Sequence, residues 1–224
     1  MKKLLFCAAM LLLSGLQALP VNAAAASQPF VRWSVYSAAT GNENALRAAV
    51  AALNTALQNS EGVLAVYGGE DENGVIRYLE IYTDENAFNA AQNSANVKTA
   101  AAQALKLAQV HKTLAADAFN LQSKTTGTAD KARMALLVID PAQLDAYKKV
   151  LAKEMQSAVA NEEGVLALLA TTETARPTYS TCWSSMPTTT LTAPTLTGRI
   201  FRNIIKPYKQ WLRIKYLSST SRRQ

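Results

Sequence analysis

The pentapeptide Glu61-Gly62-Val63-Leu64-Ala65 recurs later in the chain as Glu163-Gly164-Val165-Leu166-Ala167, an offset of 102 residues. Upstream of each copy lies a run rich in aromatic or branched aliphatic residues, FVRWSVY at 30–36 and MALLVI at 134–139. Such runs favour β-strands. Because the same features occur twice in the same order, the sequence predicts two copies of one folding unit in tandem.

Each copy places a helical pattern between its first strand and the pentapeptide. Apolar residues recur there every three or four positions, which is the period of a helix with one buried face. Asp140-Pro141 begins the second helix, since Asp is a capping residue and proline fits a first helical turn. The two stripes are Leu46, Val50, Leu53 and Leu57 in the first copy, and Leu144, Tyr147, Leu151 and Met155 in the second.

The first copy can be followed to its end. Acidic and glycine residues separate two further strand-like runs, which predicts a hairpin, and Thr83 and Asp84 are helix-capping residues before an alanine-rich segment. The expected elements are strands at 63–67, 75–82 and 118–122, a turn at 68–74 and a helix at about 85–112. The order β-α-β-β-α-β is the ferredoxin-like arrangement.

A single ferredoxin-like unit leaves one face of its antiparallel sheet uncovered, and two units can cover both faces by packing sheet against sheet. Two independent domains on a linker are the alternative. We favour the packed pair because Val31, Trp33 and Leu136 belong to strands with more apolar surface than the helices alone would cover. The expected fold class is therefore α+β, with tandem ferredoxin-like units forming a dimeric α+β barrel whose second unit is truncated by an irregular basic tail.

The expected division of the chain follows from these patterns. It comprises a signal peptide at 1–24, a first unit at 29–123, a linker at 124–130, a partial second unit at 131–179 and an irregular basic tail at 180–224.

The N-terminus has the features of a secretory signal peptide. Lys2 and Lys3 precede an apolar run at 4–13, and Val21-Asn22-Ala23 before Ala24 fits the small-x-small cleavage rule. The run is too short to span a bilayer, so we expect a periplasmic or secreted product with no stable membrane anchor. Cys182 is then the single cysteine of the mature chain, and no intrachain disulfide can form.

The formal net charge of +7 comes entirely from one end of the chain. Residues 177–224 carry eight basic and no acidic side chains, whereas residues 1–176 carry 15 basic and 16 acidic ones. One interpretation is an arm for a membrane surface or nucleic acid, because basic, aliphatic and aromatic residues interleave at 199–216. The interpretation that we favour is a one-base insertion or deletion near the codons for Pro177–Thr181, which puts the remainder out of frame.

A shifted reading of the tail restores the repeat. Trp183 and Met186 have unique codons, so part of that reading is forced. If each triplet begins at the last base of the preceding codon, permitted codons from Cys182 onward can encode LEQYADDDAYRAHLNRPHFQKY. This string aligns without gaps with LEIYTDENAFNAAQNSANVKTA at residues 79–100. The hypothesis explains the missing acidic residues and the lost repeat together, and it removes the reason to expect nucleic acid as a partner.

Several of these motifs resemble the antibiotic biosynthesis monooxygenase family, which includes quinol monooxygenases. They are Gly62-Val63-Leu64-Ala65, Leu79-Glu80-Ile81-Tyr82, Asp84-Glu85 and Ala87-Phe88 in the first copy, and the second pentapeptide with Arg176-Pro177-Thr178-Tyr179 in the second. The resemblance covers roughly residues 29–123 and 131–179.

The resemblance implies a barrel built from ferredoxin-like units, and a homodimer. Many members of the family oxygenate polyphenols or quinols with O2 and without metal or flavin, so it also implies no cofactor. The substrate itself, as its anion, donates the electron. The protein then supplies an apolar pocket and a few polar groups that orient and deprotonate the substrate. The expected partner is a small apolar or aromatic molecule.

The chain departs from the family on the second helix, where histidines are frequent and this sequence has Ala91 and Asn96. Its only histidine, His111, is expected at the end of that helix, where the helix dipole favours a solvated imidazole. No Cys/His spacing for a metal is present. Arg32 and Arg77 could hold an acidic substrate. The catalytic residues stay unassigned, and the substrate-pocket candidates are Trp33, Tyr67, Tyr78 and Tyr82, although strand aromatics more often pack in a core.

Two classes of function follow. The first is an exported, cofactor-independent monooxygenase-like protein acting on a small aromatic or quinol compound, inactive as written if the second unit is essential. The alternative is a non-catalytic ligand-binding or stress-related α+β barrel module. The missing histidines favour the second class, and the family resemblance favours the first.

Overall fold

The computed structural model of the chain describes residues 28–124, 131–186 and 212–221. The expected signal peptide, the linker beyond Lys124 and residues 187–211 of the tail lie outside these ranges. No helix of the described residues is long and apolar enough to cross a membrane.

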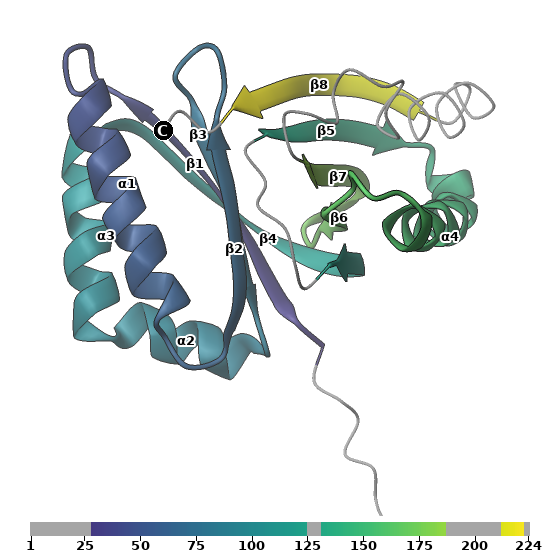
Figure 1. Cartoon of the computed structure of the whole chain (residues 1–224), viewed down its shortest axis with the longest axis horizontal. Coiled ribbons are helices and arrows are strands. Elements are labelled where there is room, and N and C mark those ends of the chain that lie inside the picture. The colour runs from purple at the N-terminus through teal and green to yellow at the C-terminus, as the bar shows by residue number, and fades with distance from the viewer. Residues whose placement is uncertain (1–27, 125–130, 187–211, 222–224) are drawn as a thin grey trace, which may run out of the picture.

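The first unit contains strands β1 to β4 and three helices, and the second contains strands β5 to β8 and helix α4 (Figure 1). In chain order the first unit has β1 (Phe30–Ala38), α1 (Glu43–Gln58), β2 (Val63–Glu70), β3 (Ile76–Tyr82), α2 (Glu85–Asn93), α3 (Ala95–Leu107) and β4 (Ala108–Ser123). The second has β5 (Lys131–Ile139), the 3-10 turn η1 (Pro141–Gln143), α4 (Leu144–Asn161), β6 (Ala167–Glu173), β7 (Arg176–Met186) and β8 (Leu212–Ser221).

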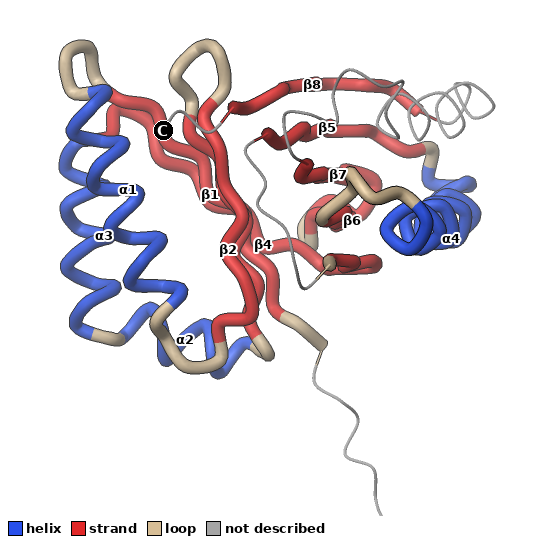
Figure 2. The backbone as a smooth tube through the Cα atoms, viewed as in Figure 1, coloured by secondary structure: helices blue, strands red, loops and turns tan. Residues whose placement is uncertain are grey.

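All eight strands form one curled antiparallel sheet in the order β2-β3-β1-β4-β6-β7-β5-β8. The long strand β4 joins the two units, because its first part pairs with β1 and its last part pairs with β6. Helices α1 to α3 cover one side of the first unit and α4 covers the second (Figure 2). The end strands β2 and β8 contact each other, so the sheet curls toward closure. The α+β class and the ferredoxin-like units are confirmed.

The two units share a core, as the packed-pair prediction requires. Successive side chains of β1 point to opposite faces of the sheet. Val31 and Trp33 face the second unit, where they lie in one buried cluster with Leu169 and Trp183. The indole nitrogen of Trp33 also donates a hydrogen bond of 3.0 Å to the hydroxyl of Thr171. Apolar burial and this buried hydrogen bond hold the units together.

The segment predicted as one helix from 85 to 112 is two helices followed by a strand. Ser94 separates α2 from α3, and its hydroxyl accepts a hydrogen bond from the backbone N–H of Val97, which caps the second helix. Helix α3 ends at Leu107, and the chain continues directly as β4. The closing strand expected at 118–122 therefore begins ten residues earlier, at Ala108, because residues 108–117 pair along β1.

The second unit extends past its expected end at residue 179. Residues 180–186 belong to β7, which pairs with both β5 and β6, and residues 212–221 form β8 on the free edge of β5. The irregular tail expected at 180–224 is therefore wrong for these two stretches. Residues Ser180, Ser184 and Ser185 are buried although they are polar, so the serine-rich composition that suggested a loop lies inside the sheet.

The repeated glycine has a structural role in the first unit. Gly62 has a φ of +77°, a left-handed conformation that glycine adopts without strain. A Cβ atom there would lie 2.5 Å from the Cβ of Ala87. The close approach lets the backbone N–H of Thr83 donate to the carbonyl of Gly62 at 2.9 Å. Asp84 then caps α2 through the N–H of Ala87. The pentapeptide thus fixes how α2 leaves the sheet.

Candidate functional site

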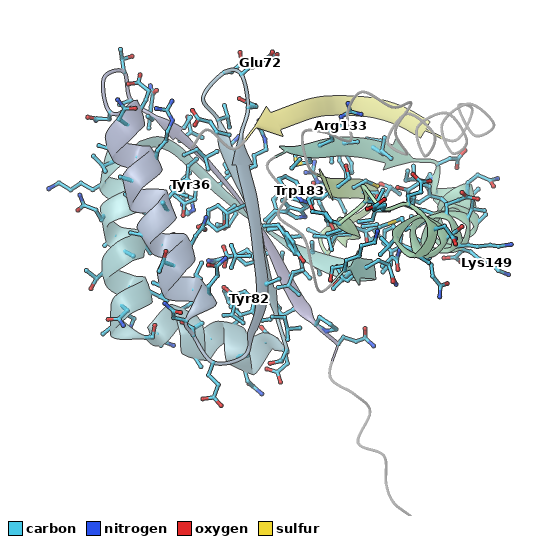
Figure 3. The ribbon with its side chains drawn as sticks, viewed as in Figure 1. Tyr36, Glu72, Tyr82, Arg133, Lys149 and Trp183 are labelled. Carbon is cyan, nitrogen blue, oxygen red and sulfur yellow. The ribbon has the colours of Figure 1, made fainter. Side chains whose placement is uncertain are left out.

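The candidate site is a layer of aromatic and charged side chains between the sheet of the first unit and helices α1 to α3. Tyr36, Tyr78 and Tyr82 point into this layer from β1 and β3 and are almost fully buried. Phe30 stacks on Phe88 of α2 with their ring centroids 4.5 Å apart. Figure 3 shows Tyr36 and Tyr82 inside this layer, between strands and helices. Aromatic rings therefore pack against one another in the space between the sheet and the helices.

A buried carboxylate organises the layer. The side chain of Glu80 is fully buried and forms an ion pair with Arg32, whose Nη2 lies 2.7 Å from Oε2. Arg32 Nε lies 3.1 Å from each carboxylate oxygen, and the Ser34 hydroxyl donates to Oε1 at 3.0 Å. The Tyr82 hydroxyl donates to Oε2. Because all these donors converge on it, Glu80 orients Arg32 and Tyr82 and is not a free proton acceptor.

The tyrosine hydroxyls of the layer keep their protons. Burial raises the pKa values of Tyr36, Tyr78 and Tyr82, and the negative charge of Glu80 raises them further. The hydroxyls of Tyr36 and Tyr78 lie 3.2 Å apart and share a hydrogen bond, and Gln92 of α2 donates to the Tyr82 hydroxyl at 3.2 Å. At neutral pH these groups therefore act as hydrogen-bonding surfaces and not as acids or bases.

His111 borders the same layer from strand β4. It lies opposite Tyr36 in the strand register, and the two ring centroids are 4.5 Å apart. The imidazole is exposed to solvent. Partial burial, together with the positive charge of Arg32, lowers the pKa of His111 below 6.5. The imidazole is therefore neutral at pH 7 and can accept a proton. The expectation that His111 lies at a helix end is wrong, because α3 ends four residues before it.

The four pocket candidates fall on opposite faces of the sheet. Tyr78 and Tyr82 belong to the helix-side layer, whereas Trp33 and Tyr67 pack in the core between the units. The two arginines considered for an acidic substrate are engaged within the protein, since Arg32 pairs with Glu80 and Arg77 pairs with Asp71 at 2.5 Å. Sequence patterns missed Glu80 and Tyr36, although their spacing of two along β3 and β1 from other layer residues was a usable signal.

Ala91 and Asn96 line an open groove of about 530 Å³ between the end of α1 and the junction of α2 with α3. The rest of the lining is alanine and small polar residues, with one carboxylate from Glu61. Histidines at these two positions would put imidazoles at the groove, and this chain has none there. Across the ranges that the structure describes, no group of three or more His, Cys, Asp or Glu side chains is placed to hold a metal ion.

A comparison with family models matches residues 30–103 to the antibiotic biosynthesis monooxygenase family. The matched segment runs from the start of β1 into α3 and contains every residue of the candidate site except His111. No protein of curated function matches the chain.

Solved structures match over both units. A candidate monooxygenase of Fusobacterium nucleatum gives a TM-score of 0.77 at 15% identity, covering 88% of this chain and 94% of that one. One from Lactobacillus acidophilus gives 0.73 at 14% identity, covering 87% and 93%. An anthrone oxidase-like protein gives 0.60 at 7% identity, covering 88% and 92%. At these identities the matches show that the tandem fold is shared.

Proposed function

Because this chain contains a domain of the antibiotic biosynthesis monooxygenase family, we propose that it is a cofactor-independent monooxygenase of a small aromatic or quinol compound. The observation that carries the proposal is the placement of His111. It is a neutral imidazole at the solvent-facing border of a buried aromatic layer, in contact with the ring of Tyr36.

The proposed reaction begins with proton transfer from a phenolic hydroxyl of the substrate to the imidazole of His111. The resulting anion gives one electron to O2, and the radical pair joins to form a carbon–oxygen bond at a ring carbon that carries hydrogen. The resulting peroxide anion takes the proton back from the His111 imidazolium, and the hydroperoxide then loses water, with the hydrogen of that ring carbon, to leave a carbonyl. One oxygen atom of O2 ends in the product and the other in water, and the substrate supplies all the electrons.

The aromatic layer contributes to this reaction by excluding water and by orienting the substrate. Tyr36 and Tyr78 stack on each other in the buried layer, and the partly exposed ring of Phe88 is the surface that we propose for an aromatic substrate; such aromatic contacts contribute about 0.5–1.5 kcal/mol each. The tyrosine hydroxyls remain protonated, so they can donate hydrogen bonds to an anionic oxygen.

A non-catalytic ligand-binding or stress-related barrel is the second candidate. One observation favours it: the only buried carboxylate of the layer, Glu80, is fully engaged by Arg32, Ser34 and Tyr82. A ligand would then meet a structured aromatic surface with the neutral imidazole of His111 at its border. The absence of imidazoles at positions 91 and 96 supports the same function.

The setting that we propose for either function is outside the cytoplasm. The N-terminal pattern of residues 1–24 supports export to the periplasm or beyond. The partner is a small apolar or aromatic molecule, with no nucleic acid and no stable membrane anchor, and the family resemblance supports a homodimer.

Oxygen consumption with a panel of hydroquinones separates the two functions. We expect the mature protein to consume O2 above the uncatalysed rate, and the His111→Gln variant to lose roughly 100-fold or more in kcat/KM. Lys112→Gln is the matched control, because Lys112 is the next residue of β4 and points to the other face. Tight ligand binding without O2 consumption by the unaltered protein would refute the enzyme and support the binding module.

The pH dependence of the reaction tests the base directly. Because the pKa of His111 is lowered below 6.5 in the folded protein, kcat/KM should be constant near pH 7. It should fall only when the pH drops toward the pKa of His111, where the imidazole becomes protonated. The His111→Gln variant should lack this acid limb. A limb of the same shape in both proteins would assign the titration to another group.

A further inference from the structure

The strand register identifies equivalent positions in the two units. In the first unit, Arg32 of β1 lies opposite Glu80 of β3. In the second unit, Arg133 of β5 lies opposite Ser184 of β7. Strands β5 and β7 occupy the places of β1 and β3, since β5 lies between β7 and β8 as β1 lies between β3 and β4. When Arg133 is matched with Arg32, position 184 is the counterpart of the buried glutamate of the first unit.

A cavity borders both Arg133 and Ser184. It has a volume of about 30 Å³ and is bordered by Arg133 and Ser184 of the sheet and by Leu151 and Met155 of α4. This volume is enough for a water-sized group. A glutamate side chain extends further than serine and could place its carboxylate in this space beside Arg133.

The side chains now present fit this place poorly. Ser184 is 6% exposed, and its hydroxyl has no hydrogen-bond partner in the described residues. The same is true of the indole nitrogen of its neighbour Trp183, which is 2% exposed. A buried polar group without a partner costs about 1–3 kcal/mol. Figure 3 labels both Arg133 and Trp183 in the second unit. Within the described ranges no acidic side chain forms an ion pair with Arg133.

The shifted reading of the tail encodes a glutamate at the same position when Ser184 has an AGC or AGT codon. Its first four letters, LEQY, take the places of residues 183–186, so that leucine stands for Trp183, glutamate for Ser184 and tyrosine for Met186. The strand registers independently pair these positions with Leu79, Glu80 and Tyr82: Trp33 lies opposite Leu79 as Met134 lies opposite Trp183. The codon reading and the strand pairing are therefore compatible with the same alignment.

We infer that the second unit is built around a second arginine–carboxylate pair, in which Arg133 is matched by a glutamate at position 184, and that each unit of the functional protein carries one such site. The second site would take the same class of ligand as the first, a small phenol or quinol, and this ligand assignment alone rests on the proposed function.

The pair is tested in the full chain by the Ser184→Glu substitution, introduced with Trp183→Leu, in two backgrounds. We expect the melting temperature with Arg133 present to exceed that with Arg133→Met by roughly 6–12 °C, because a buried carboxylate without its partner is strongly destabilising. Ser180→Glu is the matched control, since Ser180 is buried on the same strand but lies opposite Leu137. It should destabilise both backgrounds equally. Equal melting temperatures for the Ser184→Glu proteins would overturn the pairing.

The coding DNA supplies a second measurement that does not depend on folding. We expect the triplets that overlap the codons of Cys182–Met186, read from the last base of each preceding codon, to encode Leu-Glu-Gln-Tyr. A different residue at the position of the glutamate would overturn the inference. Neither result depends on turnover, so the inference can fail while the proposed oxygenase activity stands, and the reverse.

Discussion

The most informative single substitution is Glu80→Gln, because it removes the charge at the centre of the candidate site and keeps the size of the side chain. Glu80 is fully buried and accepts from Arg32, Ser34 and Tyr82. Removing one charge of a buried pair costs about 3–5 kcal/mol. We expect about 3 kcal/mol, the lower end of that range, because the Arg32 side chain keeps 18% of its exposure and can be partly hydrated.

The free energy of unfolding from urea titrations measures this loss, and the melting temperature should fall by roughly 6–12 °C. Glu70→Gln is the control, because Glu70 also makes a two-pronged pair with an arginine, Arg47, but at the surface. Exposed pairs contribute about 0–1 kcal/mol. If the two substitutions cost the same, or if Glu80→Gln costs less than about 1 kcal/mol, burial is not what makes the Arg32–Glu80 pair important.

Three further results are expected. The free energy of unfolding should fall steeply above pH 10. Burial raises the pKa values of four tyrosines, so they stay protonated in the folded state and lose their protons in the unfolded chain; they are Tyr36, Tyr78, Tyr82 and Tyr147. Unfolding titrations with tyrosinate absorbance test this, and a constant free energy of unfolding from pH 10 to 12 would contradict it. Gly62→Ala should lower the melting temperature more than Gly41→Ala does. Both glycines have a positive φ, but only at Gly62 would the added Cβ lie within 3 Å of another atom. Equal decreases in melting temperature would refute the close contact. Trp33→Phe should lower the free energy of unfolding by about 1–3 kcal/mol, because the hydroxyl of Thr171 loses its donor. In a protein that already carries Thr171→Val, the same substitution should have no effect. An undiminished loss there would show that the hydrogen bond is not the cause.

Much of the fold could be predicted because each helix and strand has its own pattern of apolar residues over a short stretch of sequence. The helical stripes contain Leu46, Val50, Leu53 and Leu57, and all four are buried in α1. The strand patterns of β1 and β3 and the cap at Asp84 were equally clear. The boundary between α3 and β4 was not predictable from the alanine-rich composition, because alanine favours a helix and pairing with β1 decides otherwise at residues 108–117.

The candidate site was harder to predict because it depends on contacts between distant residues. Tyr78 and Tyr82 were identified as aromatic strand residues, but so were Trp33 and Tyr67, and only the sheet register assigns the two pairs to different faces. Glu80 looked like part of a family motif, and its partners Arg32 and Ser34 lie 46 or more residues away. The position of His111 was predicted wrongly because the predicted helix extended to residue 112, whereas α3 ends at Leu107.

The structure also bears on the basic C-terminal part of the chain, because its first residues belong to the sheet. Residues 180–186 form part of β7, and within the described residues Ser184 and Trp183 have polar atoms without a hydrogen-bond partner and Arg133 forms no ion pair. Buried polar atoms without partners are rare in folded domains, because each one lowers the free energy of unfolding. The hypothesis of a one-base insertion or deletion near the codons for Pro177–Thr181 would account for these polar atoms and for the eight uncompensated basic residues of 177–224.

The most direct test of monooxygenation is to run the reaction of the mature protein with isotopically labelled O2 and a hydroquinone, and to follow the label by mass spectrometry. The account predicts one labelled oxygen atom in the organic product and the other in water, with the labelled product lost in the His111→Gln variant. Unlabelled product with accumulation of hydrogen peroxide, or no product at all, would contradict it.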